Sequence, residues 1–204
     1  MSILDCSEVQ KSINDCINVA HSLFNRNKVS GSSANLSFRY QDYVVITSSG
    51  SSFGTLDVDD FSVVSLDGNL LAGRKASKEA PLHLSFYKKD PNIGAVLHTH
   101  SFYSTIWSCL NHSDSKDIIP KYTPYLEMKL GKVGLIPFAP PGSKELFALA
   151  EEHINDANGF LLANHGPIVP GKNIYDAFYI LEELEESCKI AWYFRQEKDI
   201  ARIK

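Results

Sequence analysis

The sequence predicts a single domain that combines helices and strands, of the α/β or α+β class. Helical patterns stand at both ends of the chain and also between short apolar, β-branched segments. The chain has 204 residues, a length typical of one domain. No repeat, low-complexity tract or clear boundary divides it, so we expect one domain over residues 1–204.

The composition is that of an ordinary globular protein, with 44% hydrophobic and 22% charged residues and a net charge of -4. Lysines and arginines are scattered, which argues against a nucleic-acid partner. No apolar run approaches the roughly 18 residues of a membrane span, and the first residues do not resemble a signal peptide. The four cysteines have neither a CxxC nor a zinc-finger spacing and are interpreted as reduced thiols. We therefore expect a cytoplasmic protein with no membrane or nucleic-acid partner.

The N-terminal part is predicted as one helix followed by short strands. Apolar residues from Val9 to Phe24 recur at a three/four spacing, which predicts an amphipathic helix over residues 5–27. The segment VSGSSANLSF, residues 29–38, is a Gly/Ser-rich turn that leads into alternating residues. Asp67-Gly68 is a turn dipeptide between two of the strands that follow. These strands are predicted at residues 43–47, 62–66 and 69–73.

The rest of the chain alternates between helices and apolar strands. Ser77 is predicted to cap a helix over residues 77–89, and Pro81 is tolerated in the first turn of that helix. The Pro- and Gly-rich section from 120 to 146 is interpreted as a packed loop, a short strand and a helix beginning near Ser143. The remaining predictions are a strand at 95–98, a helix near 101–110, a strand broken by a tight turn at 159–171 and a long helix at 174–196.

Three histidines follow predicted strands. In GAVLHTHSFYSTI, residues 94–106, His98 and His100 are two positions apart, so in a strand both side chains point the same way. His165 also ends an apolar strand, and Gly166 after it permits a sharp turn or a close approach. Three histidines and an open position are typical of a catalytic zinc site. Taken separately, the pair is equally compatible with surface histidines, and His165 with a lone turn histidine.

Carboxylate and small-residue patterns accompany the histidines. Glu79 is a candidate fourth ligand in the first turn of its predicted helix, where the helix dipole favours a carboxylate in any case. Two loops, 31–35 and 48–54, offer backbone N–H groups and hydroxyls without bulk, as phosphate sites do. Ordinary turns share this composition.

The segments ANLS, TSSG, SKEA, HTH and LLANHG, in that order, resemble the class II aldolase/adducin family over about residues 8–195. Glu79 precedes His98 by 19 residues, which is the family's spacing. The resemblance implies a three-layer α/β/α fold with a central, mainly antiparallel sheet. It also implies one Zn²⁺ per subunit, held by His98, His100 and His165 with Glu79 as a further ligand, in a cytoplasmic homotetramer.

Within the family, TSSGSSFGTLD, SKEAPLHLSFYKKDPNIGAVLHTHS, YTPYLEMKLGKVGLIPFAPPGS and ILEELEES are most similar to the 3-oxo-tetronate 4-phosphate decarboxylases. This similarity implies a zinc-dependent decarboxylation that yields dihydroxyacetone phosphate and CO₂ through a metal-bound enediolate, in sugar-acid catabolism. A class II sugar-phosphate aldolase or epimerase is the alternative. A non-catalytic adducin-like scaffold is a more remote one, because such members lose the metal histidines and this sequence keeps all three.

The resemblance also implies roles for single residues. Glu79 would be the general acid/base. Lys78 stands where the fuculose enzyme has a small hydroxyl residue and would meet a second anionic group, such as a carboxylate. Tyr125 would be a further acid or hydrogen-bond donor, with a packed loop tyrosine as the alternative. The phosphate of a small phosphorylated sugar acid would be held by Asn35, Ser49, Gly50 and Ser77.

Overall fold

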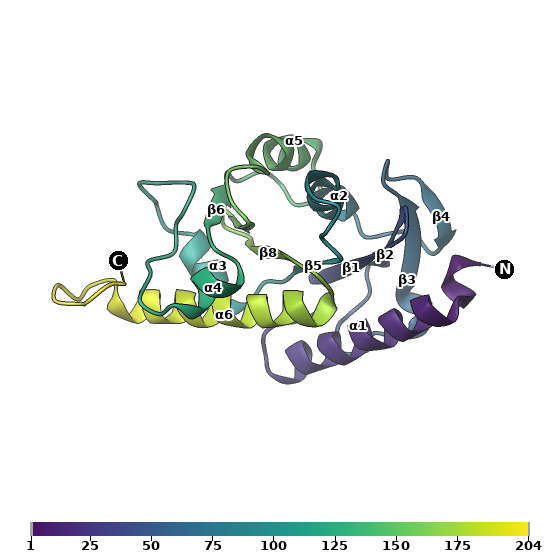
Figure 1. Cartoon of the computed structure of the whole chain (residues 1–204), viewed down its shortest axis with the longest axis horizontal. Coiled ribbons are helices and arrows are strands. Elements are labelled where there is room, and N and C mark those ends of the chain that lie inside the picture. Colours follow the sequence, from purple (N-terminus) through teal and green to yellow (C-terminus); the bar gives the residue numbers. More distant parts are fainter. Residues whose placement is uncertain (1, 204) are drawn as a thin grey trace.

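A computed structural model, which describes residues 2–203, arranges the chain in three layers (Figure 1). A sheet of eight strands forms the middle layer. Figure 1 shows α1 (Ser7–Asn25) and α6 (Ile174–Phe194) along one face, and α2 (Ala80–Lys89) and α5 (Lys144–His153) along the other. The expected three-layer α/β/α fold is therefore confirmed.

The sheet is antiparallel throughout, except for one pair of strands at its edge. Its order is β4-β3-β2-β1-β5-β8-β7-β6, and only β6 and β7 run parallel. This confirms the expected mainly antiparallel sheet. The strands are β1 (Asn35–Tyr40), β2 (Tyr43–Thr47), β3 (Phe61–Ser65), β4 (Leu70–Gly73), β5 (Ala95–His98), β6 (Val133–Ile136), β7 (Gly159–Leu162) and β8 (Gly166–Gly171).

Both faces of the sheet are buried, in two separate hydrophobic cores. Ala95 and Leu97 of β5 pack into the core beside α1 and α6, whereas Val96 packs into the core beside α2 and α5. This alternation is the period-two geometry of a strand. It places His98, two residues after Val96, on the side of the sheet that α2 covers.

The helices begin and end close to the predicted positions, with two corrections. Ser143 caps α5 as expected, since its hydroxyl accepts the N–H of Leu146. Ser77, in contrast, is not the N-cap of α2: its hydroxyl and its carbonyl oxygen accept the N–H groups of Glu79 and Ala80, so a turn precedes the helix and Glu79 takes the N-cap position.

The second correction concerns the Pro- and Gly-rich section, where the predicted packed loop contains a short helix, α4 (Tyr125–Lys129). The other short helices are α3 (Phe102–Ser108) and the 3₁₀ helices η1 (Ile3–Asp5) and η2 (Val58–Asp60). Among the described residues, no helix combines the length and the apolar character that crossing a membrane requires.

Candidate active site

Four chain segments meet where the central strands β1, β5 and β8 have neighbouring ends. Asn35, the first residue of β1, pairs with His98, the last residue of β5, and His98 pairs with Ile168 of β8 on its other side. The turn between β7 and β8 carries His165, and Glu79 begins α2 above the same strands. The antiparallel order of β1, β5 and β8 therefore gathers residues that are far apart in the sequence.

The three histidines form one cluster. The ring centroids of His98 and His100 are 5.1 Å apart, and each lies 4.8 Å from that of His165. One ring nitrogen of each lies within 4.8 Å of the others, so a single ion could contact all three. Gly166 permits this approach, because a Cβ there would overlap the carbonyl oxygen of Thr99.

Burial keeps these imidazoles neutral, which is the form that binds metals. His98 Nδ1 lies 2.9 Å from the carbonyl oxygen of Pro167, which only accepts, so Nδ1 donates and Nε2 presents its lone pair to the cluster. Burial, followed by the neighbouring His100, lowers the pKa of His98 to about 3. Burial is also the largest cause that lowers the pKa of His165 to about 3, and it lowers the pKa of His100.

Glu79 faces the histidines rather than its own helix. The residue is 3% exposed, and its side chain makes no capping hydrogen bond to α2. Oε2 accepts a hydrogen bond of 2.8 Å from Asn35 Nδ2 and lies 3.5 Å from His98 Nε2. Oε1 lies 3.6 Å from His165 Nε2. A simple helix-terminal acid would instead turn toward solvent or the helix N–H groups.

Several buried polar atoms of the cluster have no hydrogen-bond partner among the described residues. They include His98 Nε2, His100 Nε2 and Glu79 Oε1. Buried lone pairs without a partner are costly in a folded protein, and a cation would satisfy all of these at once. Imidazole nitrogens together with a carboxylate oxygen are a ligand set that suits zinc. These residues could therefore hold a divalent metal ion.

The cluster opens into a cavity of about 430 Å³. Gly50 has a φ of +84°, and a Cβ at this position would meet no atom within 4 Å, so its backbone borders open space. All five residues predicted to bind substrate or phosphate line this cavity. The lining residues are Ser30 to Asn35, Ser48 to Ser51, Ser77 to Glu79, His100, Pro141 and His165.

Lys78 adds a positive charge to the cavity. Its aliphatic chain lies against Gly142, where a Cβ would come within 2.8 Å of Lys78 Cδ. Its charge also acts on the histidine cluster. Burial lowers the pKa of His100; the charge of Glu79 opposes this shift, and the charge of Lys78 increases it. The cavity thus combines small-residue loops with a lysine whose charge acts on His100 and His165.

Comparison with known proteins defines the family. The model of the class II aldolase and adducin N-terminal domain matches residues 14–192. The chain belongs to the class II aldolase and adducin family. A 3-oxo-tetronate 4-phosphate decarboxylase from Haemophilus influenzae is 42% identical over 186 residues, which cover 89% of this chain and 87% of the relative.

Two further relatives of the family agree with this assignment. An L-fuculose phosphate aldolase from Methanococcus maripaludis is 34% identical over 182 residues, covering 89% of this chain and 97% of the relative. The crystal structure of YgbL from Escherichia coli has a TM-score of 0.90 and 37% identity, covering 96% of this chain and 94% of that one. These relatives are named as decarboxylases and aldolases, and the chain is likewise a carbon–carbon lyase of the family rather than a scaffold.

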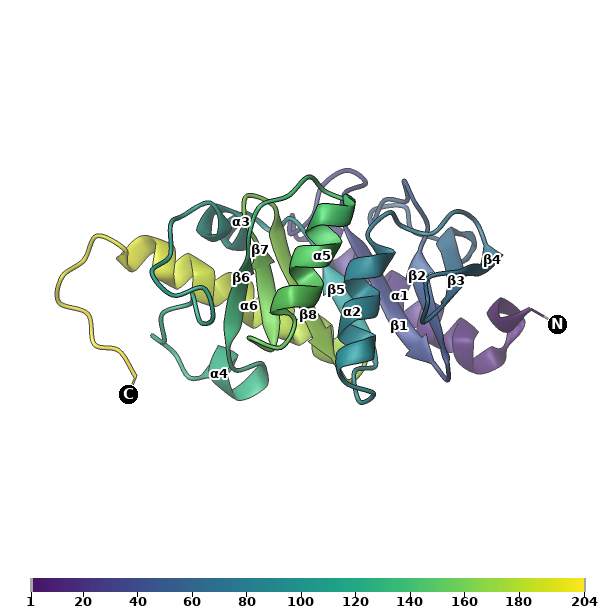
Figure 2. The ribbon, with the colours of Figure 1, turned by 90° about the horizontal axis from the view of Figure 1, so that it is seen from above.

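Tyr125 lies apart from the cavity of its own chain. It is the first residue of α4 and is 57% exposed. After α4, β6 begins at Val133, which pairs with Gly159 at the start of β7, whereas His165 follows the end of β7. Figure 2 shows α4 at the lower edge of the view, beside the start of β6. A role for Tyr125 stays a prediction.

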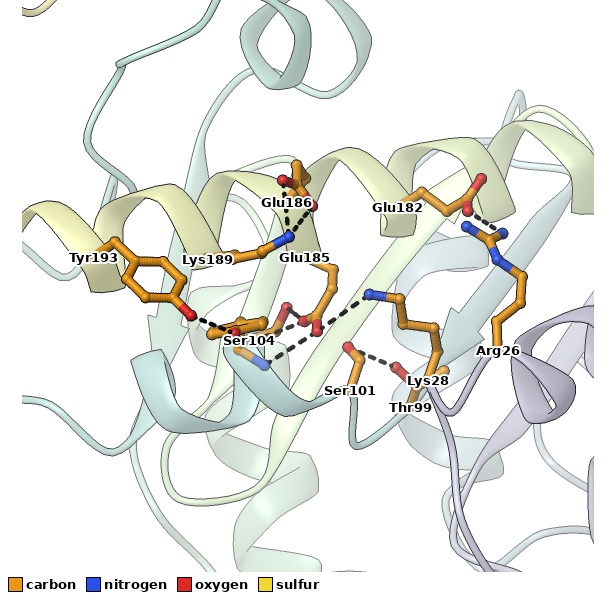
Figure 3. A network of polar contacts seen from close by, with 11 residues as sticks. Arg26, Lys28, Thr99, Ser101, Ser104, Glu182, Glu185, Glu186, Lys189 and Tyr193 are labelled. Atoms are coloured by element: carbon orange, nitrogen blue, oxygen red, sulfur yellow. Dashed lines mark hydrogen bonds and ion pairs between the residues drawn. The ribbon is translucent and has the colours of Figure 1, made fainter.

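A buried carboxylate that sequence reasoning missed, that of Glu185 in α6, contacts the start of α3 (Figure 3). Ser101, the N-cap of α3, makes no side-chain cap hydrogen bond. Glu185 of α6 takes its place: Oε1 accepts the N–H of Tyr103 at 3.1 Å, and Oε2 accepts the N–H and the hydroxyl of Ser104 at 2.9 and 2.8 Å. Lys28 Nζ lies 3.6 Å from Oε1.

The contacts of Glu185 link two segments that border the site, the start of α3 and the segment around Lys28. α3 begins two residues after His100, and Lys28 stands two residues before Ser30, where the first small-residue loop starts. One side chain on the last helix therefore holds the start of α3 and the segment that leads into the cavity. The sequence shows only a glutamate in an acid-rich helix, which gives no hint of its partners.

Proposed function

We propose that the chain is a zinc-dependent decarboxylase that converts 3-oxo-tetronate 4-phosphate to dihydroxyacetone phosphate and CO₂, in sugar-acid catabolism. The observation that carries this proposal is the cavity, which Glu79, His100 and His165 line together with small-residue loops and Lys78, and behind which His98 completes the histidine cluster. The identity to curated decarboxylases over most of the chain supports the same substrate.

The metal would be held by His98, His100 and His165, with Glu79 at a further position until substrate arrives. Bound there, zinc would supply Lewis-acid stabilisation of the negative charge that develops on a substrate oxygen. The unpartnered buried nitrogens of His98 and His100 support this assignment.

The remaining cavity residues would orient the substrate. Backbone N–H groups and hydroxyls of the loops around Asn35, Ser49 and Ser77 would bind the phosphate, and Gly50 would let it approach the backbone. The ammonium of Lys78 would face the carboxylate at the other end of the four-carbon chain. Both ends of the substrate would thus be fixed while its central carbons lie beside Glu79.

Glu79 would supply the proton that completes the reaction. The bond between the carboxylate carbon and the adjacent carbon breaks, CO₂ leaves, and the electron pair passes into an enediolate of the three-carbon fragment. The protonated carboxyl of Glu79 then donates its proton to that carbon, which becomes the CH₂OH group of dihydroxyacetone phosphate. One proton is consumed per CO₂, and Glu79 regains it from solvent.

A sugar-phosphate aldolase or epimerase is the second candidate, because L-fuculose phosphate aldolases are 34% identical over 89% of this chain. An aldolase generates the same enediolate by breaking a different carbon–carbon bond. Lys78 favours the acid substrate, since a neutral sugar chain has no group to pair with its charge.

The test is to incubate the purified, zinc-analysed protein separately with each enantiomer of 3-oxo-tetronate 4-phosphate and with L-fuculose 1-phosphate. CO₂ release and dihydroxyacetone phosphate formation are measured together. We expect equal amounts of both products from one tetronate enantiomer and none with a His98→Ala variant. Dihydroxyacetone phosphate from fuculose phosphate, without CO₂ release from either tetronate, would overturn the decarboxylase proposal.

We also propose a cytoplasmic homotetramer. Several large apolar side chains are exposed on the described chain, including Phe102, Met128 and Phe138, which supports burial between subunits. All four cysteines are free thiols, as is usual in the cytoplasm. Light scattering with size-exclusion chromatography tests the assembly, and a monomer at micromolar concentration would contradict it.

A further inference from the structure

His83 is a buried titratable residue to which the proposed reaction gives no role. It lies in α2, four residues after Glu79 and therefore on the same face of the helix, and it is 0% exposed. Its ring stands between two residues of β1: Nε2 lies 2.6 Å from Asn35 Oδ1, and Nδ1 lies 2.7 Å from Ser37 Oγ. Burial, followed by the nearby His98, lowers the pKa of His83 to about 3, so the ring is neutral and carries one proton.

The direction of each hydrogen bond follows from the orientation of the Asn35 amide between Glu79 and His83. A carboxylate only accepts, so Asn35 presents its Nδ2 to Glu79 Oε2 and its Oδ1 to His83. The Oδ1 atom also only accepts, so His83 Nε2 carries the hydrogen and Nδ1 is the acceptor. The hydroxyl of Ser37 then donates to Nδ1 and accepts from Tyr87, whose hydroxyl oxygen is 2.7 Å away.

Every donor of this chain of four hydrogen bonds points toward Glu79. Bonds aligned in this way polarise one another and strengthen the last one in a buried setting. The opposite alignment needs a different chemistry: Glu79 would be protonated on Oε2, the amide of Asn35 would be rotated, and His83 would carry its hydrogen on Nδ1. The tautomer of His83 therefore reports which alignment the protein adopts.

We propose that His83 is a positioning residue that, through Asn35, fixes the Glu79 carboxylate and leaves Oε1 as the oxygen that carries the proton to the substrate. Oε2 is held by Asn35, whereas Oε1 is buried without a hydrogen-bond partner among the described residues. The reaction that uses this proton is the one proposed above, and this part of the inference rests on it.

The first test does not depend on catalysis. Nitrogen-15 NMR of the zinc-loaded protein with labelled histidines distinguishes the two neutral tautomers, and the His83 signals are assigned by their loss in His83→Gln. We expect hydrogen on Nε2 of His83 at neutral pH. Hydrogen on Nδ1 would overturn the inference, even if the protein proves to be a decarboxylase. Absence of decarboxylation with the expected tautomer would overturn the proposed function alone.

The second test compares two substitutions of His83. His83→Leu removes the donor to Asn35, and we expect kcat to fall by about tenfold to a hundredfold because the carboxylate loses its fixed orientation. KM and zinc content should stay close to native. His83→Gln carries an amide N–H that can reach Asn35 Oδ1, and kcat should recover to within about threefold of native.

Ser85→Ala is the matched control, since Ser85 is buried on the same helix and its hydroxyl bonds only to backbone oxygens of Pro81 and Leu82. Its kcat should be native. A native kcat in folded, zinc-loaded His83→Leu would overturn the positioning role. If His83→Leu does not fold, the tautomer of the native protein decides: hydrogen on Nδ1 overturns the role, whereas hydrogen on Nε2 together with a kcat of His83→Gln within about threefold of that of Ser85→Ala supports it.

Discussion

Replacing Glu79 with Gln separates a structural acid from a catalytic one. Gln has nearly the same size, and its carbonyl oxygen can still accept the hydrogen bond that Asn35 donates at 2.8 Å. It cannot carry and return a proton. The substitution therefore preserves the buried contact at the start of α2 and removes the charge, the acid/base function and the carboxylate that would serve as the further metal ligand.

The two roles predict effects of different size. A hydrogen bond to a charged group contributes about 1.5–3 kcal/mol and a neutral one about 0.5–1.5 kcal/mol, so the loss of charge should cost roughly 1 kcal/mol of stability. Because the Glu79 side chain does not cap α2, little helix-dipole stabilisation is lost in addition. A general acid/base contributes a factor of about 10²–10⁴, so kcat should fall at least about a hundredfold, which is close to 2.7 kcal/mol at the transition state.

The assay measures kcat, zinc content and the thermal midpoint of the Glu79→Gln protein beside the native one. We expect retained zinc through His98, His100 and His165, a midpoint lowered by a few degrees, and a collapsed kcat. Cleavage can persist at a low rate, with protonation as the slow step. Turnover within threefold of native would remove Glu79 from the proton transfer and refute the reasoning.

Six other substitutions test the remaining parts of the site. Replacement of His98, His100 or His165 by Ala should in each case abolish zinc binding and activity, while the far-UV circular dichroism spectrum stays native. Full zinc occupancy in all three variants by elemental analysis would contradict the ligand assignment. Gly50→Val should raise KM at unchanged zinc content, because its backbone has a φ of +84° and borders the cavity; equal use of an unphosphorylated substrate by the native enzyme would contradict the phosphate loops. Lys78→Met should raise KM for the tetronate phosphate by about tenfold or more and leave zinc unchanged, and an unaltered KM would exclude a contact with the carboxylate. Glu185→Gln should lower stability by roughly 1–3 kcal/mol in urea denaturation and weaken zinc binding in a competition titration, since a buried charge-assisted cap is lost; native zinc affinity would confine Glu185 to stability.

Much of the fold could be predicted because its patterns are long and regular. The alternation around Val96 and the three/four spacing from Val9 to Phe24 each specify one local geometry, and the structure has both. α4 was missed because five residues between prolines and glycines are too short for a helical period to appear. The start of α2 was misplaced because the hydroxyl of Ser77 serves a turn as readily as a cap.

The site was predictable only in part, and for a physical reason. Strand geometry alone pairs His98 with His100, but the meeting with His165 depends on β5 and β8 being neighbours, which no local pattern specifies. The resemblance to the family supplied that information. His83 and Glu185 had no signal at all, since a single polar residue on a helix does not reveal its partner across the core.

The contact between Glu185 and α3 has a consequence for the order in which the molecule is completed. Glu185 lies 82 residues after Tyr103, whose N–H it accepts, and α6 is the last helix of the described chain. While the chain is being synthesised, β5 and α3 emerge long before Glu185, whose carboxylate binds the N–H groups at the start of α3. A fragment that ends before Ile174 therefore leaves the N–H groups of α3 exposed to water and the hairpin of β7 and β8 without its covering helix. Metal acquisition should accordingly be a late event in biogenesis, with an apo folding intermediate that binds zinc weakly until the C-terminal helix docks.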